Sequence, residues 1–181
     1  MPRPMNLPNL ITIARIVMVP LTIWLILIGR MDLALAVFLL AGISDGIDGF
    51  IAKRFNMRTE LGAFLDPVAD KLLLISIYVT LAIVDALPAW LAIIVVSRDV
   101  LIVGGVVLAW LLDHPMEMRP LVISKINTAV QIAFAGLYLL FRTLGWPTET
   151  LIFLGAPIVA AFTVISGALY VRDGLRHMSE G

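Results

Sequence analysis

The sequence predicts an all-α integral membrane protein with six transmembrane helices and both termini in the cytoplasm. Hydrophobic residues make up 61% of the 181 residues and charged residues only 14%, and the mean hydropathy of +1.03 is far above that of a soluble domain. Apolar stretches of about 20 residues recur along the chain, a length that matches a bilayer core of about 30 Å. We find no sign of a second unit, so residues 1–181 are interpreted as a single membrane domain.

Each apolar stretch defines one element, and polar or turn-forming residues separate them. We predict helices at residues 8–29, 33–55, 60–84, 88–112, 120–142 and 149–172. The breaks between them contain Gly, Pro, Asp or Asn, which end helices or favour turns; they lie at residues 29–32, 56–58, 85–88, 113–120 and 144–147. An even number of spans places both termini on one side of the membrane.

Basic residues decide which side that is. The side of the termini would carry Arg3, Lys53, Arg54, Arg58, Arg119, Arg172 and Arg176, and the opposite side only Arg30 and Arg142. Because loops rich in Lys and Arg stay in the cytoplasm, the termini and the loop at residues 53–60 are predicted to be cytoplasmic.

The charge balance and the lack of cysteine exclude several classes of function. Thirteen basic residues balance thirteen acidic ones, so the net charge of zero does not suggest binding to nucleic acid. Because the chain contains no cysteine, disulfides, thiolate metal sites and cysteine nucleophiles are excluded.

Four aspartates inside predicted membrane helices are the candidate functional residues. Asp45 and Asp48 belong to the second predicted helix, and Asp66 and Asp70 to the third. A carboxylate at the centre of a membrane helix costs about 3 kcal/mol, so four of them need compensation. Asp45 lies about 14 Å from the end of its helix at 1.5 Å per residue. Both pairs should therefore lie at the same depth, in the cytoplasmic half of the membrane.

The spacing of these aspartates predicts one acidic face on each helix. Residues spaced three or four apart lie on the same face of a helix. This spacing places Asp45, Asp48, Gly49 and Ala52 on one face of the second helix and Gly62, Asp66 and Asp70 on one face of the third. Carboxylate oxygens without histidine or cysteine suit Mg²⁺, Mn²⁺ or Ca²⁺ rather than zinc. Two such ions held by four aspartates would serve phosphoryl chemistry.

Two other interpretations of the aspartates stay open at this point. They could be partners in buried ion pairs, for example Asp70 with Lys71 and Asp66 with Arg98. They could also form the ion site of a cation transporter, although a single acidic cluster does not show the repeated halves typical of such proteins. Only Pro67, inside the third helix, favours the transporter.

The complete pattern resembles the signature of a known family of enzymes. The run Asp45-x2-Asp48-Gly49-x2-Ala52-Lys53-x8-Gly62-x3-Asp66-x3-Asp70 is similar to that of the CDP-alcohol phosphatidyltransferases. One position departs from it, because the family usually has Arg where this chain has Lys53. Lysine keeps the charge but lacks the two-pronged hydrogen bonding of arginine to phosphate, and Arg54 follows directly.

The resemblance implies a reaction and a set of roles. An alcohol would attack the phosphatidyl phosphorus of CDP-diacylglycerol, and CMP would leave. The four aspartates would hold two Mg²⁺ or Mn²⁺ ions, and Asp70 would also accept the proton of the incoming hydroxyl. The CDP-lipid would be bound by Gly49, Ala52, Lys53 and Gly62. The resemblance also implies a homodimer in the inner or plasma membrane of a bacterium, or the mitochondrial inner membrane, with its active site on the cytoplasmic side.

Three cations in the cytoplasmic halves of the helices would bind the acceptor alcohol. By the same resemblance, Arg15, Arg98 and Lys125 line the acceptor pocket, although each alone could simply extend to the lipid headgroups, and Asp99 could pair with a neighbouring helix. Residues 96–103 and 123–132 resemble the cardiolipin synthases of the family. We therefore expect phosphatidylglycerol as acceptor; the alternative is glycerol 3-phosphate, the acceptor of a phosphatidylglycerophosphate synthase.

Overall fold

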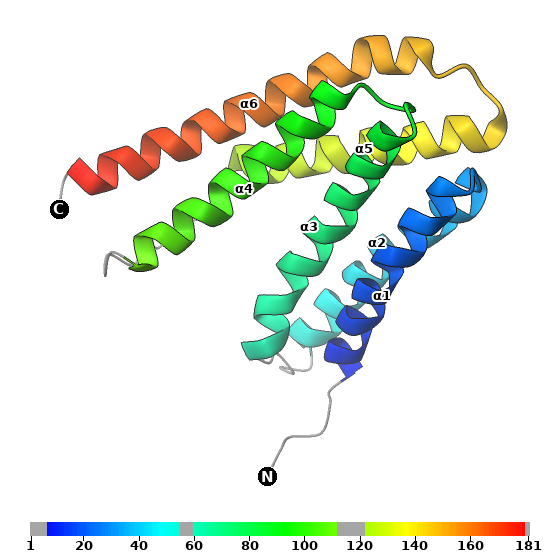
Figure 1. The fold of residues 1–181 in the computed structure, drawn as a ribbon. Helices are drawn as coiled ribbons and strands as arrows, with labels where there is room; N and C mark the ends of the chain where they lie inside the picture. The colour runs from blue at the N-terminus through cyan, green and yellow to red at the C-terminus, as the bar shows by residue number, and fades with distance from the viewer. Residues whose placement is uncertain (1–6, 55–59, 112–121, 180–181) are drawn as a thin grey trace.

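The computed structural model describes residues 7–54, 60–111 and 122–179, with side chains over residues 13–45, 71–104 and 122–173. The regular elements of the described residues are six α-helices (Figure 1): α1 Leu7–Leu27, α2 Met31–Arg54, α3 Glu60–Ile83, α4 Ala89–Leu111, α5 Val122–Leu144 and α6 Glu149–Ser179. All six predicted helices are confirmed. The main difference is that α6 continues to Ser179 instead of ending at residue 172.

The chain reverses direction at residues with left-handed backbone. Gly29 after α1 and Gly145 after α5 have φ angles of 76° and 69°, and Asp85 after α3 has 54°. After α1, the N–H groups of Gly29 and Arg30 donate to carbonyls of the last turn at 3.0 and 2.9 Å. This pattern closes a helix by satisfying its last carbonyls. The predicted breaks at these three places are confirmed, and those at residues 56–58 and 113–120 lie outside the described residues.

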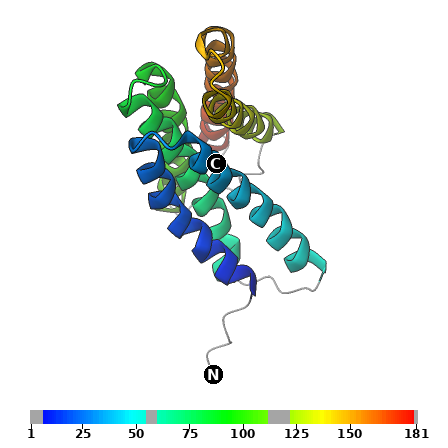
Figure 2. The same cartoon turned by 90° about the vertical axis from the view of Figure 1, so that its right-hand side faces the viewer.

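The helices pack so that α1 links the two aspartate-bearing helices. Helix α1 lies against both α2 and α3, while α5 packs against α2 and α6, and α4 against α3 and α6. Figures 1 and 2 both place the end of α2 and the starts of α1 and α3 together at one end of the molecule. The acidic turns of α2 and α3 therefore belong to the same end of the bundle.

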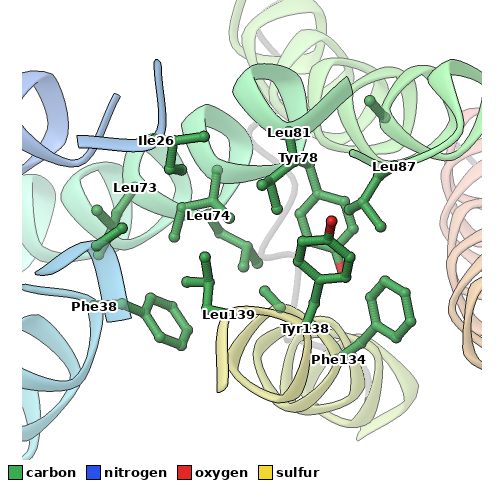
Figure 3. Packing of buried hydrophobic residues seen from close by; sticks show 14 of the residues in the cluster. Ile26, Phe38, Leu73, Leu74, Tyr78, Leu81, Leu87, Phe134, Tyr138 and Leu139 are labelled. Carbon is green, nitrogen blue, oxygen red and sulfur yellow. The ribbon is translucent and has the colours of Figure 1, made fainter. Parts of the chain in front are cut away.

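Aromatic and aliphatic side chains from all six helices fill the core. Figure 3 shows Ile26 of α1 near Leu74 of α3, and Tyr78 of α3 near Tyr138 and Phe134 of α5. The rings of Tyr78 and Phe134 stack with 6.4 Å between their centroids. On α6, an added Cβ at Gly155 would lie 2.5 Å from the Phe134 ring, so this contact requires glycine.

A chain of buried polar groups joins α3, α5 and α6. The Tyr78 hydroxyl donates to the Gln131 carbonyl at 3.0 Å, and the Gln131 amide donates to the Thr163 hydroxyl at 3.0 Å. That hydroxyl donates in turn to Asn127 Oδ1 at 2.9 Å. Because buried polar groups need such partners, this network specifies how the three helices meet.

The outer surface of the bundle is largely apolar. Trp24 of α1, Ile93 of α4 and Phe153 of α6 are 57, 63 and 77% exposed. Among the described residues, α5 and residues 149–173 of α6 are long and apolar enough to cross a membrane. Shorter apolar stretches cover residues 13–27 of α1 and 71–83 of α3. The all-helical class is therefore confirmed, with two helices of membrane-spanning length and composition.

Candidate active site

The four aspartates lie on two helices whose neighbouring ends meet the start of α1. Asp45 and Asp48 are in α2, and Asp66 and Asp70 are in α3. Asp45 is the member whose side chain the structure describes. The side chains of the other three aspartates and of Gly49, Ala52, Lys53 and Gly62 lie outside the described residues, so their convergence stays a prediction. Among the described side chains, no three potential metal ligands gather.

Arg15 of α1 meets Asp45 of α2. Their side chains form an ion pair with 2.9 Å between Nη1 and Oδ1. The Arg15 side chain is only 1% exposed, whereas that of Asp45 is 44% exposed. A buried guanidinium needs a carboxylate or other acceptors, because burial without a partner is costly. Arg15, which the sequence placed in the acceptor pocket, therefore contacts one of the predicted metal ligands and leaves that carboxylate accessible.

Arg98 of α4 is buried at the junction of three helices. Its Nη1 donates to Asp99 Oδ1 at 2.6 Å, and its Nη2 donates to Ser124 Oγ of α5 and Ser166 Oγ of α6 at 2.5 and 2.8 Å. The guanidinium also lies 5.8 Å from the centre of the Tyr170 ring, within the range of cation–π attraction. With its side chain 3% exposed, Arg98 is held on several sides by the protein itself.

Lys71 of α3 completes this cluster. Its ammonium lies 2.5 Å from Asp99 Oδ1, the same oxygen that accepts from Arg98. The expected pairing of Asp99 with a neighbouring helix is confirmed. Lys71 and Arg98 are the cations that the ion-pair interpretation assigned to Asp70 and Asp66. Both contact Asp99, and the side chains of Asp66 and Asp70 lie outside the described residues.

Lys125, the third predicted acceptor-binding cation, has an exposed side chain on α5. It follows Ser124, whose hydroxyl accepts from Arg98 at 2.5 Å. The structure thus places Lys125 next in sequence to the buried cluster, in a position that also allows its stem to extend toward headgroups.

Sequence reasoning considered Lys71 only as a possible partner of Asp70 and gave no role to the two serines. The only signal for Lys71 was that it is the single basic residue of α3 and directly follows Asp70. Ser124 and Ser166 carried no signal, since a serine inside a helix usually bonds to its own backbone. Their role depends on contacts between helices that are far apart in the sequence.

A cavity of about 420 Å³ lies at the other end of the helices. Its lining includes Gly29, Asp85, Arg142 and Glu149, from the loops that join α1 to α2 and α3 to α4 and from the facing ends of α5 and α6. The predicted ligands lie at the opposite ends of α2 and α3. The cavity therefore plays no part in the site proposed here.

Comparison with known proteins identifies the class to which this fold and this aspartate pattern belong. The chain matches the family model of the CDP-alcohol phosphatidyltransferases over residues 5–168. The chain therefore belongs to the CDP-alcohol phosphatidyltransferase family, as its sequence predicted.

Individual relatives are named for two different activities within that family. Human cardiolipin synthase (CMP-forming) is 37% identical over 145 residues, which cover 71% of this chain and 48% of the human protein. A Schizosaccharomyces pombe cardiolipin synthase (CMP-forming) / mitochondrial hydrolase fusion protein is 34% identical over 183 residues, 91% of this chain and 30% of that protein. The Bacillus subtilis CDP-diacylglycerol–glycerol-3-phosphate 3-phosphatidyltransferase is 34% identical over 185 residues, 91% of this chain and 93% of that protein. The chain thus spans about half the length of the human relative.

Proposed function

We propose that this protein transfers the phosphatidyl group of CDP-diacylglycerol to phosphatidylglycerol, producing cardiolipin and CMP. The observation that carries the proposal is the family match over residues 5–168, because that range includes both aspartate-bearing helices. The human and Schizosaccharomyces pombe relatives named cardiolipin synthase support phosphatidylglycerol as the acceptor. Membership in a family of transferases also favours an enzyme over the cation transporter considered from the sequence.

The aspartates are proposed to hold two Mg²⁺ or Mn²⁺ ions. The set fits this role because it offers only carboxylate oxygens, which hard cations prefer. Asp45 supports the fit, since its side chain stays 44% exposed although Arg15 binds one of its oxygens. Bound ions would neutralise the negative charge that develops on the phosphate oxygens during the transfer.

The residues of the chain then have distinct tasks in the reaction. The acceptor hydroxyl oxygen bonds to the phosphorus that carries diacylglycerol, and the bond from that phosphorus to the bridging oxygen breaks, so CMP leaves with the electron pair. Asp70 takes the proton of the hydroxyl. Lys53 supplies positive charge to the diphosphate. Gly49, Ala52 and Gly62 have small side chains and let the nucleotide approach the helices closely.

The proposed setting is a membrane that all six helices cross, with the active site and both termini on the cytoplasmic side. The apolar exterior of the bundle and the basic residues near the ends of α2 and α6 support this arrangement. A site at that depth can receive the cytidine group from the cytosol while the acyl chains stay in lipid. The protein would act as a homodimer in a bacterial plasma membrane or the mitochondrial inner membrane.

An acceptor panel tests the proposed reaction. Protein purified in a neutral detergent is incubated with CDP-diacylglycerol, Mg²⁺ and either phosphatidylglycerol or glycerol 3-phosphate, and lipid products are identified by mass spectrometry. We expect cardiolipin and CMP from phosphatidylglycerol and little product from glycerol 3-phosphate. Formation of phosphatidylglycerophosphate without cardiolipin would contradict the proposed acceptor and leave the transferase class intact.

A second candidate is the synthesis of phosphatidylglycerophosphate. It is favoured by the Bacillus subtilis relative, which this chain covers over 93% of its length. Glycerol 3-phosphate carries nearly two negative charges and enters from the cytosol, so it would need more fixed positive charge than a phosphodiester. In the structure, Arg15 and Arg98 already bind protein carboxylates, which leaves less positive charge for such an acceptor.

A further inference from the structure

The cations near the predicted site differ sharply in how accessible they are. The side chains of Arg15 and Arg98 are 1 and 3% exposed, and both bind carboxylates of the protein. The side chain of Lys71 is 34% exposed, although it too contacts Asp99. Of the three, Lys71 is therefore the one that a substrate can reach without displacing buried side chains.

The described side chains that contact one another around Lys71 carry more positive than negative charge. Lys71 and Arg98 share one carboxylate, and both donate to the same oxygen of Asp99. The other oxygen, Oδ2, is buried and has no hydrogen-bond partner within the described part of the chain. Among the described side chains of this cluster, two cations and one carboxylate give a net charge of +1. Because excess charge in a partly buried place is costly, this arrangement favours binding of an anion.

The structure around the cluster limits where that anion lies. Arg98 donates hydrogen bonds to Ser124 of α5 and Ser166 of α6, and it also binds the adjacent Asp99. These contacts hold the Asp99 carboxylate, which in turn contacts the Lys71 ammonium. Lys71 directly follows Asp70 on α3, and its support belongs to α4, α5 and α6. The Lys71 ammonium thus lies on the side of α3 that faces α4. The second substrate would bind on this side, because the residues proposed for the CDP-lipid lie mainly on α2.

We propose that Lys71 binds a phosphate oxygen of the acceptor and that Asp99, fixed by Arg98, is a positioning residue that holds the Lys71 ammonium in place. This proposal rests on the proposed function, because it assigns a contact to the second substrate of that reaction. It changes the role of Arg98 from a direct ligand of the acceptor to a buried support. The acceptor phosphodiester then approaches Lys71 while its hydroxyl lies near Asp70.

The central test compares Lys71→Met with Lys71→Arg. Loss of a hydrogen bond to a charged group should raise the KM for phosphatidylglycerol at least about tenfold in Lys71→Met, with the KM for CDP-diacylglycerol unchanged. Lys71→Arg keeps the charge and should recover most of the affinity. Arg142→Met, which removes an exposed cation at the other end of α5, serves as the matched control and should leave both KM values unchanged.

The role of Asp99 is tested separately, by Asp99→Asn. If Asp99 positions Lys71, this variant should raise the KM for phosphatidylglycerol in the same direction as Lys71→Met, with little further loss in the double variant. Additive effects of the two substitutions would contradict the positioning role. If Asp99→Asn does not fold, as judged by thermal unfolding in detergent, Asp99→Glu replaces it.

A binding measurement separates this proposal from the proposed function. Equilibrium binding of short-chain phosphatidylglycerol to the protein in neutral detergent needs no turnover, and it should weaken at least about tenfold in Lys71→Met. Equal binding by wild type and Lys71→Met, or a rise in the KM for CDP-diacylglycerol instead, would overturn the assignment of Lys71. Absence of any lipid product from the wild type would instead contradict the proposed function. The binding measurement would still test whether Lys71 contacts phosphatidylglycerol.

Discussion

Buried arginines in this protein are matched by carboxylates from specific positions. Arg15 binds Asp45 of another helix, and Arg98 binds the adjacent Asp99, which also binds Lys71 of α3. Isolated charges of this kind would be too costly in the interior, so each pair fixes the orientation of both partners. At the residue scale, ion pairs therefore hold the described buried cations in place, and one of them includes the predicted metal ligand Asp45.

Metal dependence is the first prediction at this scale. Asp66→Asn replaces a proposed carboxylate ligand with a neutral amide, so CMP release should fall to background while the helical content stays that of the wild type. EDTA should likewise stop turnover by the wild type, and millimolar Mg²⁺ or Mn²⁺ should restore it. A second measurement, the rise in thermal unfolding temperature on addition of Mn²⁺, should be smaller in Asp66→Asn than in the wild type. Full activity of the variant in metal-free buffer would contradict the two-metal site.

Lys53 provides the second prediction. Lys53→Ala should raise the KM for CDP-diacylglycerol with little effect on the KM for the acceptor, because the proposed role of Lys53 is to bind the diphosphate. Lys53→Arg should retain activity, since arginine binds phosphate at least as well. Steady-state kinetics with each substrate varied in turn make the measurement. An unchanged KM for CDP-diacylglycerol in Lys53→Ala would transfer the role to Arg54.

Close contact between α5 and α6 is the main feature at the scale of the elements. Phe134 of α5 lies directly over Gly155 of α6, and the same ring stacks on Tyr78 of α3. Because the ring is 5% exposed and packed on both sides, it has little room to move away from a larger residue.

A substitution at this contact gives the third prediction. Gly155→Ala should lower the stability of the protein by about 1–3 kcal/mol, the usual cost of overpacking a filled core. Gly104→Ala is the matched control, because an added Cβ there meets nothing within 4 Å. The control should be neutral or stabilising by up to about 1 kcal/mol, since alanine favours helix more than glycine. Thermal unfolding in detergent compares the two, and equal stability of both variants would contradict the packing seen at Gly155.

The orientation of the whole molecule in the membrane yields the fourth prediction. The chain has no cysteine, so single cysteines can be introduced without background labelling. Glu149→Cys and Arg172→Cys place a thiol near opposite ends of α6, at exposed positions. In sealed vesicles of known orientation, a membrane-impermeant thiol reagent should label Arg172→Cys from the cytoplasmic side only and Glu149→Cys from the other side only. Labelling of both from one side would contradict a membrane-spanning α6.

The order and length of the helices could be predicted from the sequence because they depend on local pattern. Apolar stretches and turn residues such as Gly29, Asp85 and Gly145 act within a few residues, and the helices begin and end near the predicted places. The pattern of the four aspartates could also be recognised from the sequence, because its spacing lies within two helices that follow one another in the chain. The greater length of α6 was missed because its last turns are polar and offer no hydrophobic signal.

The partners of the charged residues were decided only by the tertiary structure. The sequence by itself determined the family and the helices and predicted a set of carboxylate ligands for metal, but it assigned Arg15 and Arg98 to the acceptor. In the folded chain, α1 brings Arg15 onto Asp45, and α4 carries Arg98 and Asp99 to Lys71, Ser124 and Ser166. Helical periodicity tells which residues share a face, but it does not tell which helix that face meets. That choice depends on packing over the whole bundle, which leaves Lys71 as the accessible cation of its cluster.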